Sequence, residues 1–117
     1  MRAEVLKGHL DVLLLAVLEP GPRHGYAVME ALRTGSGGRI DLPTGTVYPA
    51  LHRLERAGLI RGDWAVVAGR RRRSYQLTAS GRRALGTERA LWREFAAAVS
   101  SMLEPDAQGP APWAATT

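Results

Sequence analysis

The stretch from Thr44 to Gly58 constrains this chain most, because it has the pattern of one short amphipathic helix. Val47, Leu51 and Leu54 recur at i, i+4 and i+7, so a helix would place them on one face. Threonines, a phenol, an imidazole and guanidiniums fall on or near the other faces. Such a helix is suited to a DNA groove, although an ordinary surface helix would show the same pattern.

Both ends of this helix are marked in the sequence. Thr44 or Thr46 can cap the start by accepting a backbone N–H, and Gly58 suits the left-handed residue that ends many helices. If Thr46 is the cap, Pro49 lies in the first turn, where its missing N–H costs little. If Thr44 is the cap, one hydrogen bond is lost and the helix bends slightly.

Length and residue types limit the class of protein. A chain of 117 residues predicts one domain with a modest core, and the lack of cysteine excludes disulfides and thiolate metal sites. The longest apolar run, Val12–Leu18, is far shorter than the ~20 residues of a membrane helix. No signal-peptide pattern is visible at the start, so a cytoplasmic protein that does not enter a membrane is expected.

Positive charge is concentrated in one third of the chain. The net charge is +5, yet residues 44–83 carry nine arginines against two acidic residues, whereas the rest is slightly acidic. Clustered positive charge is typical of a protein that binds a polyanion. The three histidines are not spaced as a metal site, and no nucleophile and base pattern is visible. We therefore expect no metal, no cofactor and no enzyme.

Two more helices are expected before this stretch. Apolar spacing predicts one over residues 9–18 and another over residues 24–34, which His24 opens. The prolines in Glu19–Pro22 end the first of them, because proline cannot continue the hydrogen-bond ladder.

A hairpin is predicted behind the three helices. Residues 59–67, with Gly62-Asp63 as a candidate bulge, and residues 74–77 have the composition of strands, and the basic turn 68–72 joins them. A lone hairpin is barely stable in water, so it must pack on the helices, with Trp64 and Leu77 as the inward candidates. Three helices followed by such a hairpin predict the winged variant of a helix-turn-helix domain.

The longest predicted helix covers residues 78–103, with Thr78 as its cap. At ~1.5 Å per residue it spans ~39 Å, against a radius of gyration of ~13 Å for a compact domain, so we expect it to protrude. Its apolar positions continue with a spacing of seven, which is typical of a helix that packs on a partner. We expect a homodimer with an interface of Leu85, Leu91, Trp92, Phe95, Val99 and Met102.

Four segments in a fixed order carry a family resemblance. They are His24-Gly25-Tyr26, Gly45–Ile60, Gly69–Tyr75 and Tyr75–Gly81. Together they resemble the PadR family of bacterial transcriptional regulators over roughly residues 6–103. The length and the single C-terminal helix are similar to the smaller subfamily, which lacks a long C-terminal domain.

The resemblance implies a fold that is mainly α with a small β-hairpin (α+β). The expected parts are a winged helix-turn-helix domain over residues 1–77, a C-terminal dimerisation helix over 78–103 and a disordered tail over 104–117. Family members are homodimeric repressors, and many of them release DNA when they bind small aromatic or hydrophobic effectors. We expect a sequence-specific regulator that binds a pseudo-palindromic operator in double-stranded DNA. A winged-helix module that binds protein instead of DNA is the alternative.

Five DNA contacts are expected on the helix over residues 44–58, which would be the recognition helix. Thr44, Thr46 and Tyr48 would reach phosphates, while His52 and Arg53 would lie nearer the base edges. A phosphate contact is the equal alternative for Arg53. His52 could equally be a solvated surface residue, and Tyr48 could be half-buried against the second helix.

The basic wing supplies the other expected contacts, Arg70, Arg71, Arg72 and Arg73. Alternate residues of a strand point to opposite faces, so two of these arginines would face DNA at once. The effector candidate is Trp92, which matches a tryptophan that stacks planar drugs at the dimer centre in multidrug-sensing relatives. An ordinary core residue of the dimer seam is the alternative for Trp92.

Overall fold

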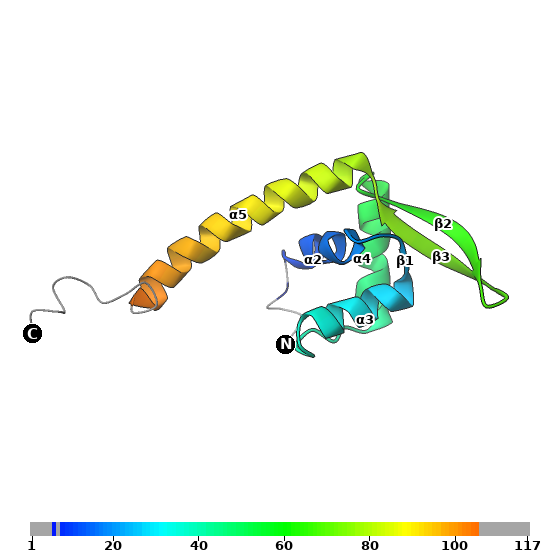
Figure 1. Cartoon of the computed structure of the whole chain (residues 1–117), viewed down its shortest axis with the longest axis horizontal. Coiled ribbons are helices and arrows are strands. Elements are labelled where there is room, and N and C mark those ends of the chain that lie inside the picture. The colour runs from blue at the N-terminus through cyan, green and yellow to red at the C-terminus, as the bar shows by residue number, and fades with distance from the viewer. Residues whose placement is uncertain (1–5, 7, 106–117) are drawn as a thin grey trace, which may run out of the picture. The chain divides into compact units, whose positions relative to one another are not determined.

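The computed structural model describes residue 6 and residues 8–105. The chain divides into two compact units between Leu85 and Gly86, so the start of the last helix belongs to the first unit. Most of the predicted tail, residues 106–117, lies outside the described residues. In chain order the elements are α2 (Leu10–Leu18), β1 (Arg23–His24), α3 (Gly25–Gly35), α4 (Thr44–Arg56), β2 (Ile60–Val67), β3 (Arg70–Leu77) and α5 (Ala79–Leu103) (Figure 1).

The mainly α fold with a small antiparallel sheet confirms the predicted fold class. His24 opens α3 as expected, because its Nδ1 accepts a hydrogen bond of 3.2 Å from the N–H of Ala27. At the start of α5, the Thr78 hydroxyl oxygen accepts from the N–H of Gly81 at 3.0 Å. Both helices therefore have a side-chain cap that satisfies one of the first backbone donors.

The start of α4 differs from the prediction. Its N-cap is Pro43, which has no side-chain cap, and the Pro43 carbonyl accepts from the N–H groups of Thr46 and Val47. Neither Thr44 nor Thr46 caps the helix. Pro49 therefore lies inside α4 rather than in its first turn, and one hydrogen bond of the ladder is missing.

The end of α4 confirms the predicted role of Gly58. Its φ of 76° is in the left-handed region. Its N–H donates to the backbone carbonyl of Glu55, and the N–H of Leu59 donates to the carbonyl of Leu54. These two bonds form a Schellman motif, which stops the helix and turns the chain into β2.

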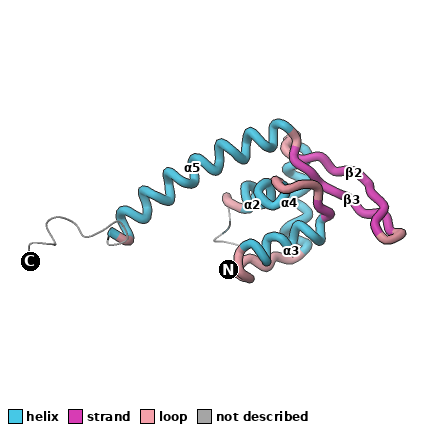
Figure 2. Tube along the Cα trace, viewed as in Figure 1, coloured by secondary structure: helices cyan, strands magenta, loops and turns pink. Residues whose placement is uncertain are grey.

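The sheet has the order β1-β3-β2, and every pair is antiparallel. The two-residue strand β1 was not predicted, because a strand of that length cannot show an alternating pattern. The hairpin turn is only Ala68–Gly69, with φ values of 53° and 76° (Figure 2). The prediction of a turn over residues 68–72 is wrong: Arg70–Arg73 belong to β3 and pair with β2.

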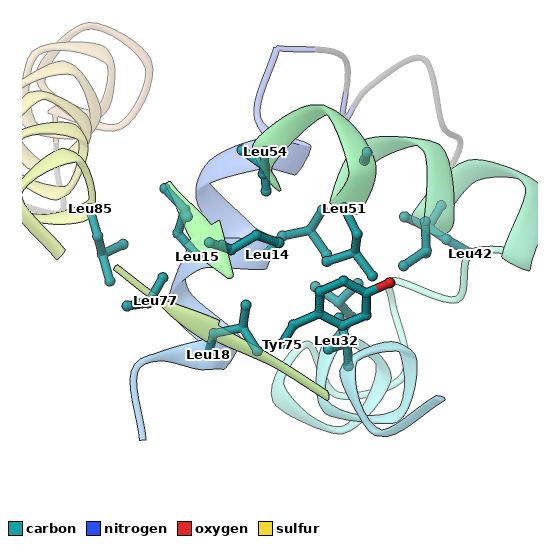
Figure 3. Packing of buried hydrophobic residues seen from close by; sticks show 14 of the residues in the cluster. Leu14, Leu15, Leu18, Leu32, Leu42, Leu51, Leu54, Tyr75, Leu77 and Leu85 are labelled. Atoms are coloured by element: carbon teal, nitrogen blue, oxygen red, sulfur yellow. The ribbon is translucent and has the colours of Figure 1, made fainter. Parts of the chain in front are cut away.

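The core of the first unit lies between the three helices and one face of the sheet. Tyr75 is 1% exposed, and Figure 3 shows its ring among the leucines of α2, α3 and α4. Leu77 is also buried, as predicted, but Trp64 is 60% exposed and is not an inward residue. Trp64 pairs with Arg73, two residues closer to the turn than Tyr75, and its side chain stays largely outside the core.

The predicted role of Leu85 also requires a correction. It is 2% exposed and belongs to the core cluster of the first unit, so it is not an exposed residue of a dimer seam. Figure 3 shows it beside Leu77 of β3. The first turns of α5 complete the core, and Gly81 fits there because a Cβ would overlap the backbone carbonyl of Leu59.

Candidate nucleic-acid interface

The outer face of α4 combines small residues with polar ones. At 3.6 residues per turn, Gly45, Pro49, His52 and Arg56 lie opposite the buried stripe, and all four are exposed. Thr44 is exposed at the helix start, while Thr46 and Tyr48 are half-buried at the flanks of this face. The buried stripe itself consists of Val47, Ala50, Leu51 and Leu54.

Arg56 was missed as a contact candidate, although its position one turn after His52 could have indicated it. Both side chains lie where a groove-bound helix would face base edges. The small Gly45 and the ring of Pro49 leave little between the backbone of α4 and an approaching duplex.

Arg53 lies at the edge of this face and is not free. Its Nη2 donates to Oδ1 of Asp11 on α2 at 2.6 Å, and the two side chains are 60% and 46% exposed. A solvent-exposed pair of this kind contributes roughly 0–1 kcal/mol. Arg53 can therefore exchange Asp11 for a phosphate or base at small cost.

Tyr48 packs on the start of α3. A Cβ on Gly25 would stand 2.6 Å from the ring carbons of Tyr48, so only glycine allows this approach. The alternative that places Tyr48 half-buried against the second helix is confirmed. The glycine of the His-Gly-Tyr segment thus sets the distance between α3 and α4.

The register of the hairpin divides the four wing arginines between two faces. Arg71 and Arg73 share a face with their partners Val66 and Trp64, and this face continues from the core. Arg70 and Arg72 lie on the opposite face. Beyond the helices, the core-side face therefore carries exposed apolar and cationic side chains together.

Arg73 is held by helix α4. Its Nη2 donates to Oε2 of Glu55 on α4 at 2.6 Å, and the same oxygen accepts from the N–H of Gly62 at 3.0 Å. This hydrogen bond raises the pKa of the Arg73 guanidinium above its ordinary value. A Cβ on Gly62 would lie 2.7 Å from Nε of Arg73, so glycine makes room for the pair.

This pair changes the expected role of Arg73 and gives Glu55 a role that was not predicted. Arg73 was expected to reach a phosphate, but its guanidinium connects the wing to α4. Glu55 was not expected in the site at all, because a single carboxylate on a basic helix gives no signal of its partner in sequence.

Arg71 stacks on the aromatic ring of the wing. Its guanidinium carbon lies 4.9 Å from the centroid of Trp64, which is within the range of a cation–π contact. The stack holds a long cationic side chain near the hairpin turn while both groups remain exposed.

A hollow of about 490 Å³ lies between the start of α3, α4 and the hairpin. Three arginines and three aromatic rings line it, and none of the lining residues is acidic. The lining residues are His24, Gly25, Tyr26, Tyr48, Trp64, Arg71, Arg72 and Arg73.

The second unit presents a separate apolar surface on α5. Leu91, Trp92, Phe95 and Met102 are exposed and Val99 is half-buried, and helical spacing places all five within an arc of about 100°. The rings of Trp92 and Phe95 lie 6.0 Å apart at an angle of 47°. This face is uncovered within its own unit.

Residues 6 and 8–105 offer neither a candidate metal site nor a helix that could cross a membrane. No group of three or more potential ligands among His, Cys, Asp and Glu could hold a metal ion there. Across the same part of the chain, no helix is long and apolar enough to cross a membrane.

Three helices and a basic antiparallel hairpin define a winged helix-turn-helix protein. A family model described as the transcriptional regulator PadR-like family matches residues 14–87, more than half of the chain. The chain belongs to this family. Since the family is one of transcriptional regulators, the prediction of a regulator rather than an enzyme is confirmed.

Individual relatives show the same similarity. Transcriptional regulator Rv3488 of Mycobacterium tuberculosis is 42% identical over 74 residues, which is 63% of this chain and only 56% of that protein. A PadR family transcriptional regulator from Eggerthella lenta is 31% identical, with a TM-score of 0.75 over 87% of this chain and 88% of that chain. Bacillus subtilis PadR, solved in complex with operator DNA, has a TM-score of 0.61 and 24% identity over 68% of this chain and 45% of that chain.

Proposed function

We propose that this protein is a homodimeric, sequence-specific DNA-binding repressor that a small hydrophobic or aromatic effector releases from its operator. The observation that carries the proposal is the positive charge shared by α4 and the hairpin: Arg53 and Arg56 of α4 are exposed, and three arginines of the hairpin line a hollow without an acidic residue. The fold is also that of Bacillus subtilis PadR, which was solved with operator DNA. DNA binding would place the protein in the cytoplasm.

The roles within this surface follow from its geometry. His52, Arg53 and Arg56 of α4 would contact base edges or nearby phosphates in the major groove. Thr44, Thr46 and the Tyr48 hydroxyl would contact the backbone at the helix start. Arg70, Arg71 and Arg72 of β3 would contact phosphates beside the groove.

The second copy is proposed to cover the exposed face of α5. Four large apolar side chains on one face would otherwise stay in water, and their burial stabilises an interface by about 25 cal/mol per Å² of apolar surface. Two copies related by a dyad would recognise half-sites ~34–36 Å apart, or a multiple of that distance. The two Trp92 rings would meet near the dyad and form the effector site.

The experiment that tests the proposal is selection of duplexes from a random pool, followed by fluorescence anisotropy at ~150 mM salt. We expect a pseudo-palindromic site bound ~10³-fold or more tightly than a shuffled duplex. Equal affinity for both duplexes would instead favour the protein-binding alternative.

Two variants separate base contacts from phosphate contacts. His52→Ala should reduce the preference for the selected site, whereas Arg71→Ala should weaken all duplexes and lower the slope of log K against log salt by ~0.9 per phosphate lost. Arg82→Ala, which removes the same charge at the exposed start of α5, is the matched control and should leave that slope unchanged.

Effector binding at Trp92 is tested by fluorescence in a Trp64→Phe, Trp113→Phe background. A planar cationic dye should quench Trp92, and Trp92→Leu should abolish dye binding while the dimer survives. A dye affinity that Trp92→Leu leaves unchanged would remove Trp92 from the effector site.

A further inference from the structure

The His24 ring brings two hydrogen-bond donors face to face. Its Nδ1 accepts from the N–H of Ala27 at 3.2 Å, and a neutral imidazole has only one acceptor nitrogen, so Nε2 carries the hydrogen. Nη1 of Arg72 lies 3.2 Å from that Nε2, and a guanidinium can only donate. In the tautomer that caps α3, the contact between His24 and Arg72 therefore brings two donors together, and both point at a place that requires an acceptor.

The backbone holds these two donors in place. His24 pairs with Ser74 in the ladder between β1 and β3, and Arg72 lies two residues before Ser74 on the same face of β3. Both side chains are half-buried. The two donors therefore converge because of strand pairing and not because of a loose surface contact.

The residues that line the hollow favour an anion that has apolar groups on either side. Among the cations of the hollow, Arg73 already has Glu55 as its partner, so Arg71 and Arg72 keep an uncompensated charge there. Tyr26 and Trp64 present exposed rings at the same hollow. A volume of about 490 Å³ leaves room for more than one phosphate group.

We propose that the hollow binds one backbone phosphate of the DNA duplex, with a non-bridging oxygen that accepts from both His24 Nε2–H and Arg72. Tyr26 and Trp64 lie against the sugars on either side of this phosphate. The inference rests on the proposed function and adds His24, Tyr26 and Trp64 to its contacts. The shared oxygen replaces a donor–donor contact with two hydrogen bonds, one of them charge-assisted.

The test uses the full-length protein, the selected operator duplex and two substitutions. His24→Asn keeps the cap of α3, because asparagine is as good an N-cap acceptor, but it removes the Nε2–H donor. Arg72→Ala removes the charged donor. Arg70→Ala is the matched control, because it removes the same charge from the same face of β3 outside the hollow.

We expect each of the two substitutions to weaken binding about tenfold, as for a hydrogen bond to a charged group. Arg72→Ala should also lower the salt slope by ~0.9 per phosphate, whereas the neutral His24→Asn should leave that slope unchanged. The double variant should lose less affinity than the sum of the two single losses, because either substitution already relieves the donor–donor contact of the free protein. His24→Asn and Arg70→Ala should instead be additive. Thermal unfolding of His24→Asn should match the parent, which checks that the cap is intact.

Additive losses for His24→Asn and Arg72→Ala, or no loss in either, would overturn the shared phosphate while the parent still binds its operator. A parent protein that binds no duplex selectively would instead end the proposed function. Adenosine monophosphate distinguishes the duplex backbone from a free nucleotide. If this probe bound at micromolar concentration without DNA, and His24→Asn abolished that binding, the hollow would be a nucleotide site and the proposal would be wrong.

Discussion

The two units of the chain carry the same kind of apolar stripe on a helix, but only the first unit buries it. On α4, the leucines and valine at helical spacing are all buried within the first unit. On α5 after Gly86, Leu91, Trp92, Phe95 and Met102 follow the same spacing and remain exposed. Periodicity thus indicates which face of a helix needs cover, and only the tertiary structure shows whether the chain itself supplies it.

The strongest test of this comparison is truncation of a covered residue. Leu51→Ala leaves a cavity in a well-packed core, so the free energy of unfolding should fall by ~2–5 kcal/mol. Urea denaturation at one fixed protein concentration measures it. A loss below ~1 kcal/mol would mean that this core is packed less tightly than its burial indicates.

A charged substitution tests whether the exposed apolar stripe of α5 forms the dimer interface. Phe95→Asp should raise the dimer dissociation constant at least ~30-fold, because a hot-spot residue contributes ~2 kcal/mol or more and a desolvated charge opposes association. Sedimentation equilibrium measures the constant. Ala97→Asp, on the opposite face of α5, is the control and should leave association unchanged. Equal effects of the two substitutions would break the comparison.

A third prediction concerns the tightest contact of the covered region. Gly25→Ala should destabilise the protein by ~1–3 kcal/mol, because the added methyl group meets the Tyr48 ring. Tyr48→Leu in the same chain should recover part of that loss by giving the methyl group room. Thermal unfolding of the two single variants and the double variant measures the coupling, and strict additivity would show that the loss in Gly25→Ala does not come from the Tyr48 ring.

The smallest expected effect is a pH dependence. Burial raises the pKa of Tyr75, and the charge of Arg73 only partly opposes this. The folded state therefore keeps the phenolic proton after the unfolded state loses it near pH ~10, so stability is present below that pH and falls as pH rises. Between about pH 10 and 11, Tyr75→Phe should lose less stability than the parent, by at most ~1.4 kcal/mol per pH unit. If the stability of Tyr75→Phe and of the parent fell equally with pH, Tyr75 would not be the cause of the fall.

Local patterns predicted the helices and strand β2 closely, but only the second half of β3. The end of α4 at Gly58 and the Thr78 cap depend only on neighbouring residues, so they are readable in sequence. Strand β1 could not be predicted, because two residues acquire a sheet partner only when the chain folds back on β3.

Contacts between distant residues explain the errors at the site. Trp64 is no less apolar than Tyr75, yet only the register shows that one lies beyond the helices. Arg73 is one of four consecutive arginines, and nothing local distinguishes it. Its partner Glu55 lies 18 residues away, so the pair exists only in the folded protein.

The carboxylate of Glu55 has a consequence for how a duplex would be read. By joining the backbone of β2 and the side chain of Arg73 to α4, it fixes the opening between the helix and the hairpin. On DNA, a helix and hairpin held in this way would respond to groove width before any base edge is touched. Sequences that match the opening without bending would be favoured over those that must deform.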